Sequence, residues 1–247
     1  MAYTYANINR VYTGVQTVLN KQQLGFASVS QFNTIARIAQ DTIFDKKIDA
    51  LNSQVRNKIR NLDTTTRSLE QRAEEDLAPL FVYNETQSAS SGTNIFDFPS
   101  NCAYVKEIAY NGNPVDIVTP IKAKYYTSSY YTPPTDEYCI AIMGSNKIEI
   151  IGDNLSSALT MSYYRRPRGS VSGAASSNYP TWGFVSVGEN QVYNSATSTD
   201  FELPSFLEQE IIYEISSIMG MNLRDIEAVQ YSQQKTAEDQ QTETPLR

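Results

Sequence analysis

The chain contains no histidine, and only two of its 247 residues, Cys102 and Cys139, are cysteines. Without histidine, Ser-His-Asp and Cys-His catalysis and most catalytic zinc sites are excluded. Two cysteines are too few for a disulfide scaffold and lack metal-ligand spacing, so we expect two reduced thiols. A glycine-rich phosphate loop is also missing. These absences predict a protein that is not an enzyme and that carries no metal or cofactor.

Long apolar runs are absent as well. No stretch approaches the roughly 18 apolar residues that a membrane span requires. The opening residues, MAYTYANINR, lack the basic start and apolar run of a secretory signal, so we expect no export and no membrane partner. A net charge of -7 argues against a dedicated nucleic-acid binder, while 40% apolar content is enough to bury a core.

The first third of the chain has a helical pattern. A short helix is expected over about residues 8–21. A longer one begins where Ser28 and Gln31 have capping-box spacing, with Ser30 as a competing cap. If unbroken over 31–62, it would be on the order of 45 Å long. Its apolar positions form one face: Phe32, Ile35, Ala36, Ala39, Ile43, Phe44, Ile48, Leu51, Val55, Ile59 and Leu62.

Between residues 79 and 203 the apolar period changes from 3.6 to 2. The stretch 104–118 predicts a hairpin, because Asn111-Gly112 can adopt the positive φ angles of a tight turn. A second hairpin is expected over 138–152, and a further strand ends at Pro167. Short strands separated by turns predict a sandwich or small barrel.

Two segments in this region are expected to project as loops, over about 122–137 and 169–183. The first contains Tyr125, Tyr126, Tyr130 and Tyr131, and tyrosines favour protein contacts. A second interpretation, that these tyrosines cover the sheet, fits the sequence as well as a protein contact does. A carbohydrate-stacking site fits it less well. The second loop is small and polar and ends at Trp182, the only tryptophan.

A late helix begins at Pro204, with Ser205 and Glu208 in capping-box spacing. Its apolar stripe needs a partner, and the long N-terminal helix offers one. We therefore predict an α+β fold. Residues 1–78 and 204–247 would form a helical bundle, and 79–203 an inserted antiparallel β-sandwich or barrel domain. Residues 225–241 are polar and are expected to fray.

Charge is distributed unevenly. Residues 46–72 are mainly basic and the chain from Asp200 onward is mainly acidic, so these patches would pair within a subunit, pair between copies or remain solvated. The arginines in YYRRPRG (163–169) fit phosphate contact or pairing with carboxylates. The candidate subunit-interface residues are Lys46, Lys47, Arg56, Lys58, Arg60, Tyr125, Tyr126, Tyr130, Tyr131, Arg165, Arg166, Arg168, Glu208, Glu210 and Glu214.

Only one adjacent carboxylate pair suggests acid–base chemistry. Asp136 and Glu137 follow TPPT, and this context is more typical of a polar turn. Carboxylates brought together from distant strands, as in glycosidases, would leave no signal in spacing. An enzyme with such a dispersed site is therefore retained as one alternative.

Three segments, taken in order, resemble virion structural proteins of short-tailed bacteriophages. They are SVSQFNTIARIAQDTIFDKKIDAL (28–51), LTMSYYRRPRG (159–169) and DFELPSFLEQEIIYEISSIMGMNLRDIEAVQYSQQK (200–235). More narrowly, they look like the head-to-tail connector or tail ring proteins beneath the portal, of the kind found in crAss-like phages. The resemblance is one of pattern and segment order, without a diagnostic motif, and it brings no catalytic residues.

The resemblance implies a multi-subunit ring, commonly twelvefold in such tails, at the head–tail junction of the virion. The implied partners are copies of the chain itself, the portal protein and neighbouring tail ring proteins. Genomic DNA would pass through the lumen without specific binding, and assembly would take place in the host bacterial cytoplasm. A second hypothesis is a binding module, namely a capsid-decorating, glycan-binding or adhesin-like virion protein.

Overall fold

The computed structural model describes residues 4–20, 28–59, 72, 74–87, 89, 94–131, 133–152, 158–171, 174–188, 190–222 and 234–235. Contacts divide the chain into two compact units. The first comprises Met1–Pro79 and Pro167–Arg247, and the second comprises Leu80–Arg166. The fold is α+β, as expected, with helices in both units and sheets that are mainly antiparallel.

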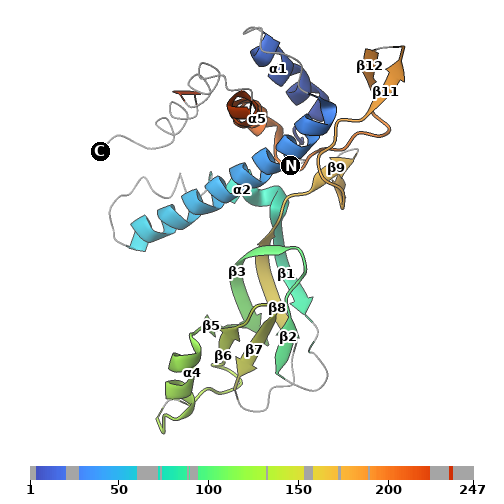
Figure 1. Cartoon of the computed structure of the whole chain (residues 1–247). Coiled ribbons are helices and arrows are strands. Elements are labelled where there is room, and N and C mark those ends of the chain that lie inside the picture. Colours follow the sequence, from blue (N-terminus) through green and yellow to red (C-terminus); the bar gives the residue numbers. More distant parts are fainter. Residues whose placement is uncertain are drawn as a thin grey trace. The chain divides into compact units, whose positions relative to one another are not determined.

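The helices of the first unit include α1 (Ile8–Asn20), α2 (Val29–Ile59) and α5 (Glu208–Asn222). Helix α5 packs against both α1 and α2, which confirms the expected contact between the late helix and the long one (Figure 1). Each helix buries one apolar face. The buried side chains are Ile8, Val11, Val15 and Leu19 on α1, Phe32, Ile35, Ala36, Ala39, Ile43, Phe44, Ile48 and Leu51 on α2, and Ile211, Ile215 and Met219 on α5.

The N-terminus of α2 is a reciprocal capping box. The backbone N–H of Gln31 donates to Ser28 Oγ (3.3 Å), and that of Ser28 donates to Gln31 Oε1 (3.2 Å). Ser28 and not Ser30 is therefore the cap, and it satisfies amides that have no partner within the helix. The expected continuation of this helix beyond residue 59 lies outside the described residues.

The start of α1 is held by residues almost two hundred positions away. Asp200 Oδ1 accepts from the backbone N–H of Ile8 (2.8 Å), and Glu208 Oε1 accepts from that of Asn7 (2.9 Å). Beside them, the Ala6 N–H donates to the Leu203 carbonyl (2.9 Å). Two carboxylates at a helix N-terminus stabilise its unpaired amides and its positive dipole end.

This use of Glu208 corrects the capping box expected at the start of the late helix. Ser205–Leu207 form a 3-10 turn, and α5 begins only at Glu208. The turn has no side-chain cap, and the Leu207 N–H donates to the Pro204 carbonyl instead (3.0 Å). Ser205 and Glu208 have the spacing of a capping box, but the Glu208 carboxylate accepts from the Asn7 N–H at the start of α1 instead.

The segment 169–183 is not the projecting loop that we expected. It contains β9 (Gly169–Val171) and β10 (Ala174–Ser176), which form a three-stranded sheet with β13 (Asp200–Phe201). At its end, Trp182 is buried: its ring stacks on Tyr12 (centroids 4.2 Å apart) and its Nε1 donates to Asn9 Oδ1 (3.1 Å). The only tryptophan thus anchors this segment to α1.

A buried polar network fixes α2 to the same sheet. The Gln40 side chain donates to the Arg168 carbonyl (2.6 Å) and accepts from the Glu202 N–H (3.1 Å). Glu202 is fully buried and its Oε2 accepts from the Arg168 N–H (2.8 Å). These bonds satisfy polar groups that would be costly to bury without a partner.

The second unit contains two four-stranded sheets. One has the order β1-β8-β3-β4, and the other β2-β7-β6-β5. Both bury side chains in one shared cluster that includes Phe96, Ile108, Ile148, Ile150 and Met161. Neither sheet closes into a barrel in the described part of the chain. The strands are β1 (Phe81–Gln87), β2 (Ile95–Asp97), β3 (Cys102–Tyr110), β4 (Asn113–Pro114), β5 (Asp116–Ile117), β6 (Ile140–Met143), β7 (Lys147–Ile151) and β8 (Leu159–Arg165).

Both predicted hairpins are confirmed: β3 pairs with β4 across Asn111-Gly112, whose φ angles are 49° and 81°, and β6 pairs with β7. The outgoing strand of the first hairpin is shorter than expected, because β5 leaves it and pairs in parallel with β6. The expected loop over 122–137 begins as a helix, α4 (Pro120–Thr127), which lies beside β6 (Figure 1).

The boundary of the inserted domain also differs from the expected one. We expected it to end at residue 203, but the second unit ends at Arg166. Residues 167–203 carry β9 to β13, and these strands belong to the first unit. The β-pattern of the sequence continues across this boundary, so periodicity could not locate it.

Candidate subunit interface

Two basic residues expected at a subunit interface are paired inside the chain. Lys46 Nζ lies 2.7 Å from Glu214 Oε2. The buried Lys47 lies 3.3 Å from Glu210 Oε2 and 3.5 Å from Asp76 Oδ2. These bridges join α2 to α5, so this part of the basic and acidic patches is neutralised within a subunit.

One further acidic candidate and three further basic candidates belong to the same charged segments. Glu208 pairs with Arg10 Nε at 3.0 Å, in addition to its bond to α1. The side chains of Arg56 and Lys58, and the whole of Arg60, lie outside the described residues.

The arginines of YYRRPRG have different environments. Arg166 is exposed and Arg165 is half-buried. Arg168 is half-buried, and its guanidinium lies 4.6 Å from the ring centroid of Tyr179, which Arg37 approaches at 3.6 Å. Tyr179 thus lies against two guanidinium groups, an arrangement favourable to cations. The pattern of the sequence singled out the arginines but not this tyrosine.

The four tyrosines expected at an interface are exposed on the second unit. Tyr125 and Tyr126 lie on α4, and Tyr130 and Tyr131 follow it with 91% and 90% of their surface exposed. Thr119 caps α4 by accepting from the Lys122 N–H (3.4 Å), and Pro120 starts the helix. We define the tyrosine surface by its large exposed side chains: Ile121, Tyr125, Tyr126, Tyr130, Tyr131 and Tyr138.

Helix α4 contributes very little to the core of its own unit. Ala123 is its only buried residue, and the other seven are exposed. An eight-residue helix is marginal in water without packing. Large exposed apolar and aromatic side chains concentrated in one segment are typical of an interaction site, and six lie within residues 121–138. Most of the tyrosine side-chain surface on and after α4 is therefore exposed, although α4 itself lies beside β6.

A second exposed apolar surface lies on the first unit. Strands β11 (Phe184–Val187) and β12 (Asn190–Tyr193) pair with each other and join no larger sheet in the described chain. Their hairpin projects from the helices in Figure 1, and it exposes Phe184, Val185, Val187 and Val192. This hairpin was not expected from the sequence, although FVSVGENQVY alternates with period 2 around a glycine.

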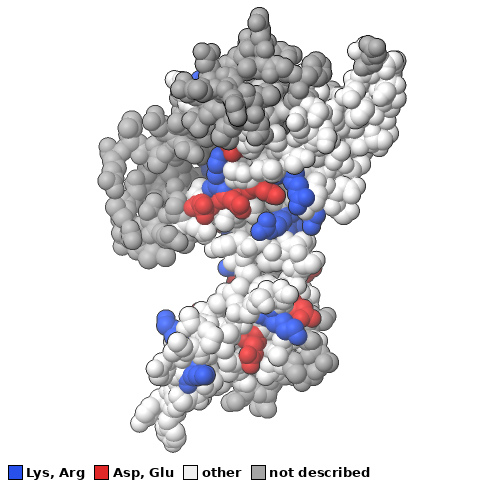
Figure 2. All heavy atoms as spheres, in the orientation of Figure 1, with Lys and Arg blue, Asp and Glu red and all other residues white. Residues whose placement is uncertain are grey.

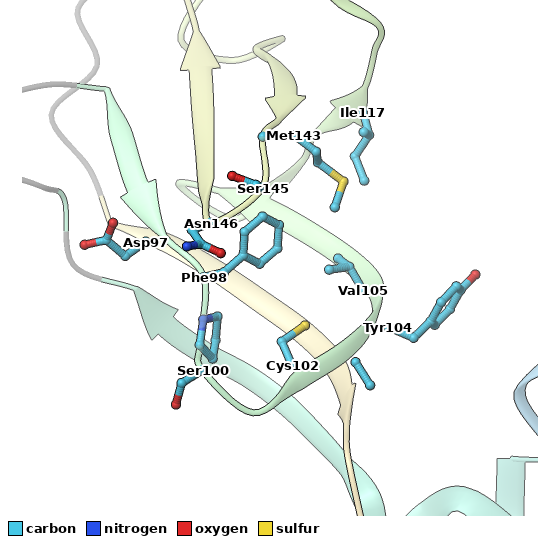
Figure 3. Close-up of a pocket in the computed structure, with 13 residues that line it drawn as sticks. Asp97, Phe98, Ser100, Cys102, Tyr104, Val105, Ile117, Met143, Ser145 and Asn146 are labelled. Atoms are coloured by element: carbon cyan, nitrogen blue, oxygen red, sulfur yellow. The ribbon is translucent and has the colours of Figure 1, made fainter. Parts of the chain in front are cut away.

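The second unit also has a hollow of about 850 Å³ between β3 and the β6–β7 turn. In Figure 3, Phe98, Val105, Cys102 and Met143 line its middle, and Asp97 and Asn146 lie at one side. Phe98, Cys102 and Val105 also pack against the core, so the floor is apolar. Such a hollow can accept an apolar side chain, but it has no group of acid–base residues.

The remaining sequence candidates have structural roles. Asp136 and Glu137 lie in a turn in which the Thr135 N–H donates to the Tyr138 carbonyl (3.4 Å), so the turn interpretation is confirmed.

Both cysteines are free thiols. Among the described residues no cluster of three or more His, Cys, Asp or Glu side chains is arranged to hold a metal ion. No helix in those ranges combines the length and apolar character of a membrane span.

No protein-family model matches the chain. No curated protein matches it either.

Proposed function

We propose that this protein is a virion structural component, a head-to-tail adaptor or tail ring protein that assembles in several copies around the DNA channel beneath the portal. The observation that supports this most directly is the presence of two unlike exposed apolar surfaces. One is the tyrosine surface of the second unit, and the other is the β11–β12 hairpin of the first. A ring requires a heterologous contact between different patches, and a chain with unlike exposed surfaces can supply such patches for its neighbours.

The proposal includes a finer view of the architecture. The helices from both ends of the chain would form a bundle, and the two sheets of the second unit would be a β-sandwich inserted into it. The packing of α5 on α1 and α2 supports the first part. The buried cluster shared by both sheets supports the second.

The chemistry of the surfaces fits a part that works by assembly. Its partners would be other copies, the portal protein and neighbouring ring proteins, and it would act during ejection of the viral genome. The net charge of -7 suits a channel wall that does not retain DNA, since affinity for phosphate comes mainly from lysine and arginine. The site of action would be the tail of the virion, after assembly in the host cytoplasm.

Electron microscopy and sedimentation of the purified full chain test this proposal. We expect closed rings, or oligomers that grow with concentration, and rings of the same symmetry on the portal protein. A chain that remains monomeric at high concentration and that ignores the portal would contradict the proposal.

A glycan-binding virion protein is the second candidate, and the exposed tyrosines favour it. The rings of Tyr130 and Tyr131 meet edge to face at 88°, however, so they do not form one flat platform on which a sugar would stack. Binding to a glycan array that is lost in Tyr130→Ser/Tyr131→Ser would support this second candidate instead.

A further inference from the structure

The tyrosine surface carries positive charge as well as aromatic rings. Lys122 and Lys124 lie on α4 among the exposed tyrosines, and both side chains are exposed. Neither lysine makes an ion pair within the described chain. In Figure 2, basic side chains lie in the region of α4 with uncharged atoms around them. A partner for this surface should therefore combine carboxylates with accessible apolar area.

The outer side of α2 has this composition. Asp41, Asp45 and Asp49 follow one another at intervals of four residues, which places them on one face of the helix. Figure 2 shows acidic side chains in a row over α2. Ile38 lies one turn before them and is 48% exposed. We call Ile38, Asp41, Asp45 and Asp49 the acidic face.

The acidic face points away from the core of its unit. Ile43, Phe44 and Ile48 are buried, whereas Asp45 and Asp49 are exposed and make no ion pair among the described residues. Carboxylates four residues apart repel each other and slightly destabilise a helix. A cationic partner would remove this cost. On the same helix, Lys46 and Lys47 already pair with α5, so they do not neutralise the acidic face.

We propose that the tyrosine surface of one copy docks on the acidic face of α2 in the next copy, with Lys122 and Lys124 opposite Asp45 and Asp49. This inference rests on the proposed function, and it names the heterologous contact that would propagate a ring. Charge complementarity identifies the occupant: the two surfaces have opposite charge, and both offer apolar area beside the charges. Because the two patches differ, a copy that binds one neighbour through its tyrosine surface can bind the next neighbour through its acidic face.

Charge reversal with mixing tests the contact. The first variant is Lys122→Glu/Lys124→Glu, and the second is Asp45→Lys/Asp49→Lys. In the first variant the tyrosine surface and the acidic face both carry negative charge, and in the second both carry positive charge. Copies of one variant therefore repel each other at the proposed contact. In an equimolar mixture, every junction between unlike variants is again complementary. Exposed control substitutions elsewhere are Lys147→Glu and Glu149→Lys.

Sedimentation velocity over a concentration series, at low and at moderate salt, gives the readout. We expect each variant alone to need a concentration roughly tenfold higher than wild type to assemble, because like charges meet. The mixture and the fourfold variant should assemble at wild-type concentration, and both controls should behave as wild type. Salt should weaken the wild-type contact. Circular dichroism verifies that each variant is folded.

Three results would overturn the inference. Unchanged assembly of both variants shows that the surfaces are not involved. Failure of the mixture, when the fourfold variant assembles, shows a contact within one chain. Wild type that never assembles overturns the proposed function as well, whereas wild-type rings with unaffected variants overturn only this contact. If Lys122→Glu/Lys124→Glu does not fold, Tyr130→Ser/Tyr131→Ser tests the same surface, and its unchanged assembly would equally contradict the contact.

Discussion

At the scale of single residues, the core of the second unit retains protons on two acidic groups. The Tyr163 hydroxyl donates to Glu85 Oε2, and Asn101 Oδ1 lies 3.2 Å from the same hydroxyl oxygen. Burial, and then its bond to Glu85, raises the pKa of Tyr163. Burial also raises the pKa of the Cys102 thiol to about 11, and the charge of Glu85 adds to this effect. Both groups are therefore neutral near pH 7.

The thiol of Cys102 should react slowly, although it lines the hollow in Figure 3. The thiolate is the nucleophile, and a pKa of about 11 in place of 9.0 lowers its fraction near pH 8 roughly a hundredfold. We expect iodoacetamide to modify Cys102 about a hundredfold more slowly in the folded chain than in urea, with the rate rising up to about pH 11. Mass spectrometry of timed samples measures this. Equal rates in both states would contradict the shift.

The same shifts have a consequence for stability at alkaline pH. Because both acids have a higher pKa in the folded state, the folded chain keeps protons that the unfolded chain releases. For Cys102 this contribution is complete below about pH 9 and is lost as the pH rises toward 11, whereas for Tyr163 the loss begins only above about pH 10.

At the scale of elements, the N-terminus of α1 depends on residues from the other end of the chain. Asp200 accepts from the Ile8 N–H and from Asn7 Nδ2, and Glu208 accepts from the Asn7 N–H. Asn7 itself caps the helix through Oδ1, which accepts from the N–H groups of Asn9 and Arg10 (3.1 Å each). Helix α1 is thus capped locally by Asn7 and fastened remotely by the two carboxylates.

Removal of the remote carboxylate should destabilise the first unit. We expect Asp200→Ala to lower the free energy of unfolding by about 1–2 kcal/mol, since it leaves the Ile8 amide without its acceptor and removes a negative charge from the helix N-terminus. Urea unfolding measures the loss. Asp97→Ala, an exposed carboxylate of β2, is the matched control and should change stability little. If both variants lose the same amount, Asp200 has no special role in holding α1.

At the scale of the whole molecule, the chain passes from the first unit into the second just before β1 and returns just after β8. β1 and β8 are antiparallel partners, and Phe81 lies opposite Tyr164. The two ends of the inserted unit are therefore adjacent within its own sheet. The unit also has a buried cluster drawn entirely from its own residues.

The inserted unit should fold when it is excised. We expect a fragment of residues 80–166 to unfold cooperatively and to show dispersed NMR signals, because its pairing and its core are internal. The matched control is a fragment of 79–203, the boundary that periodicity suggested. It adds β9 to β13, which pair with one another but are held in place by bonds to α1 and α2 that the fragment lacks, so its extra residues should be cleaved readily by protease. A fragment 80–166 without cooperative unfolding would show that the unit depends on the rest of the chain.

The candidate interface was only partly predictable. The exposure of Tyr130 and Tyr131 follows from their place in a polar, proline-containing stretch, so the sequence was sufficient to suggest it. The pairing of Lys46 with Glu214 was one of several alternatives, because their separation of 168 residues hides which charges meet. The acidic face was not recognised, since alternating charges along α2 obscure a stripe that appears only on the helix surface.

The sequence by itself determined several local elements: the helical character of α1, α2 and α5, the capping box at Ser28 and the turn at Asn111-Gly112. Periodicity, caps and turn conformations act over a few residues, so they are encoded where they occur. Tertiary structure alone decided that Glu208 binds α1 rather than its own helix, that Trp182 is buried, and that the inserted unit ends at Arg166. These outcomes depend on contacts between distant segments, and their free energy exists only once the chain has brought those segments together.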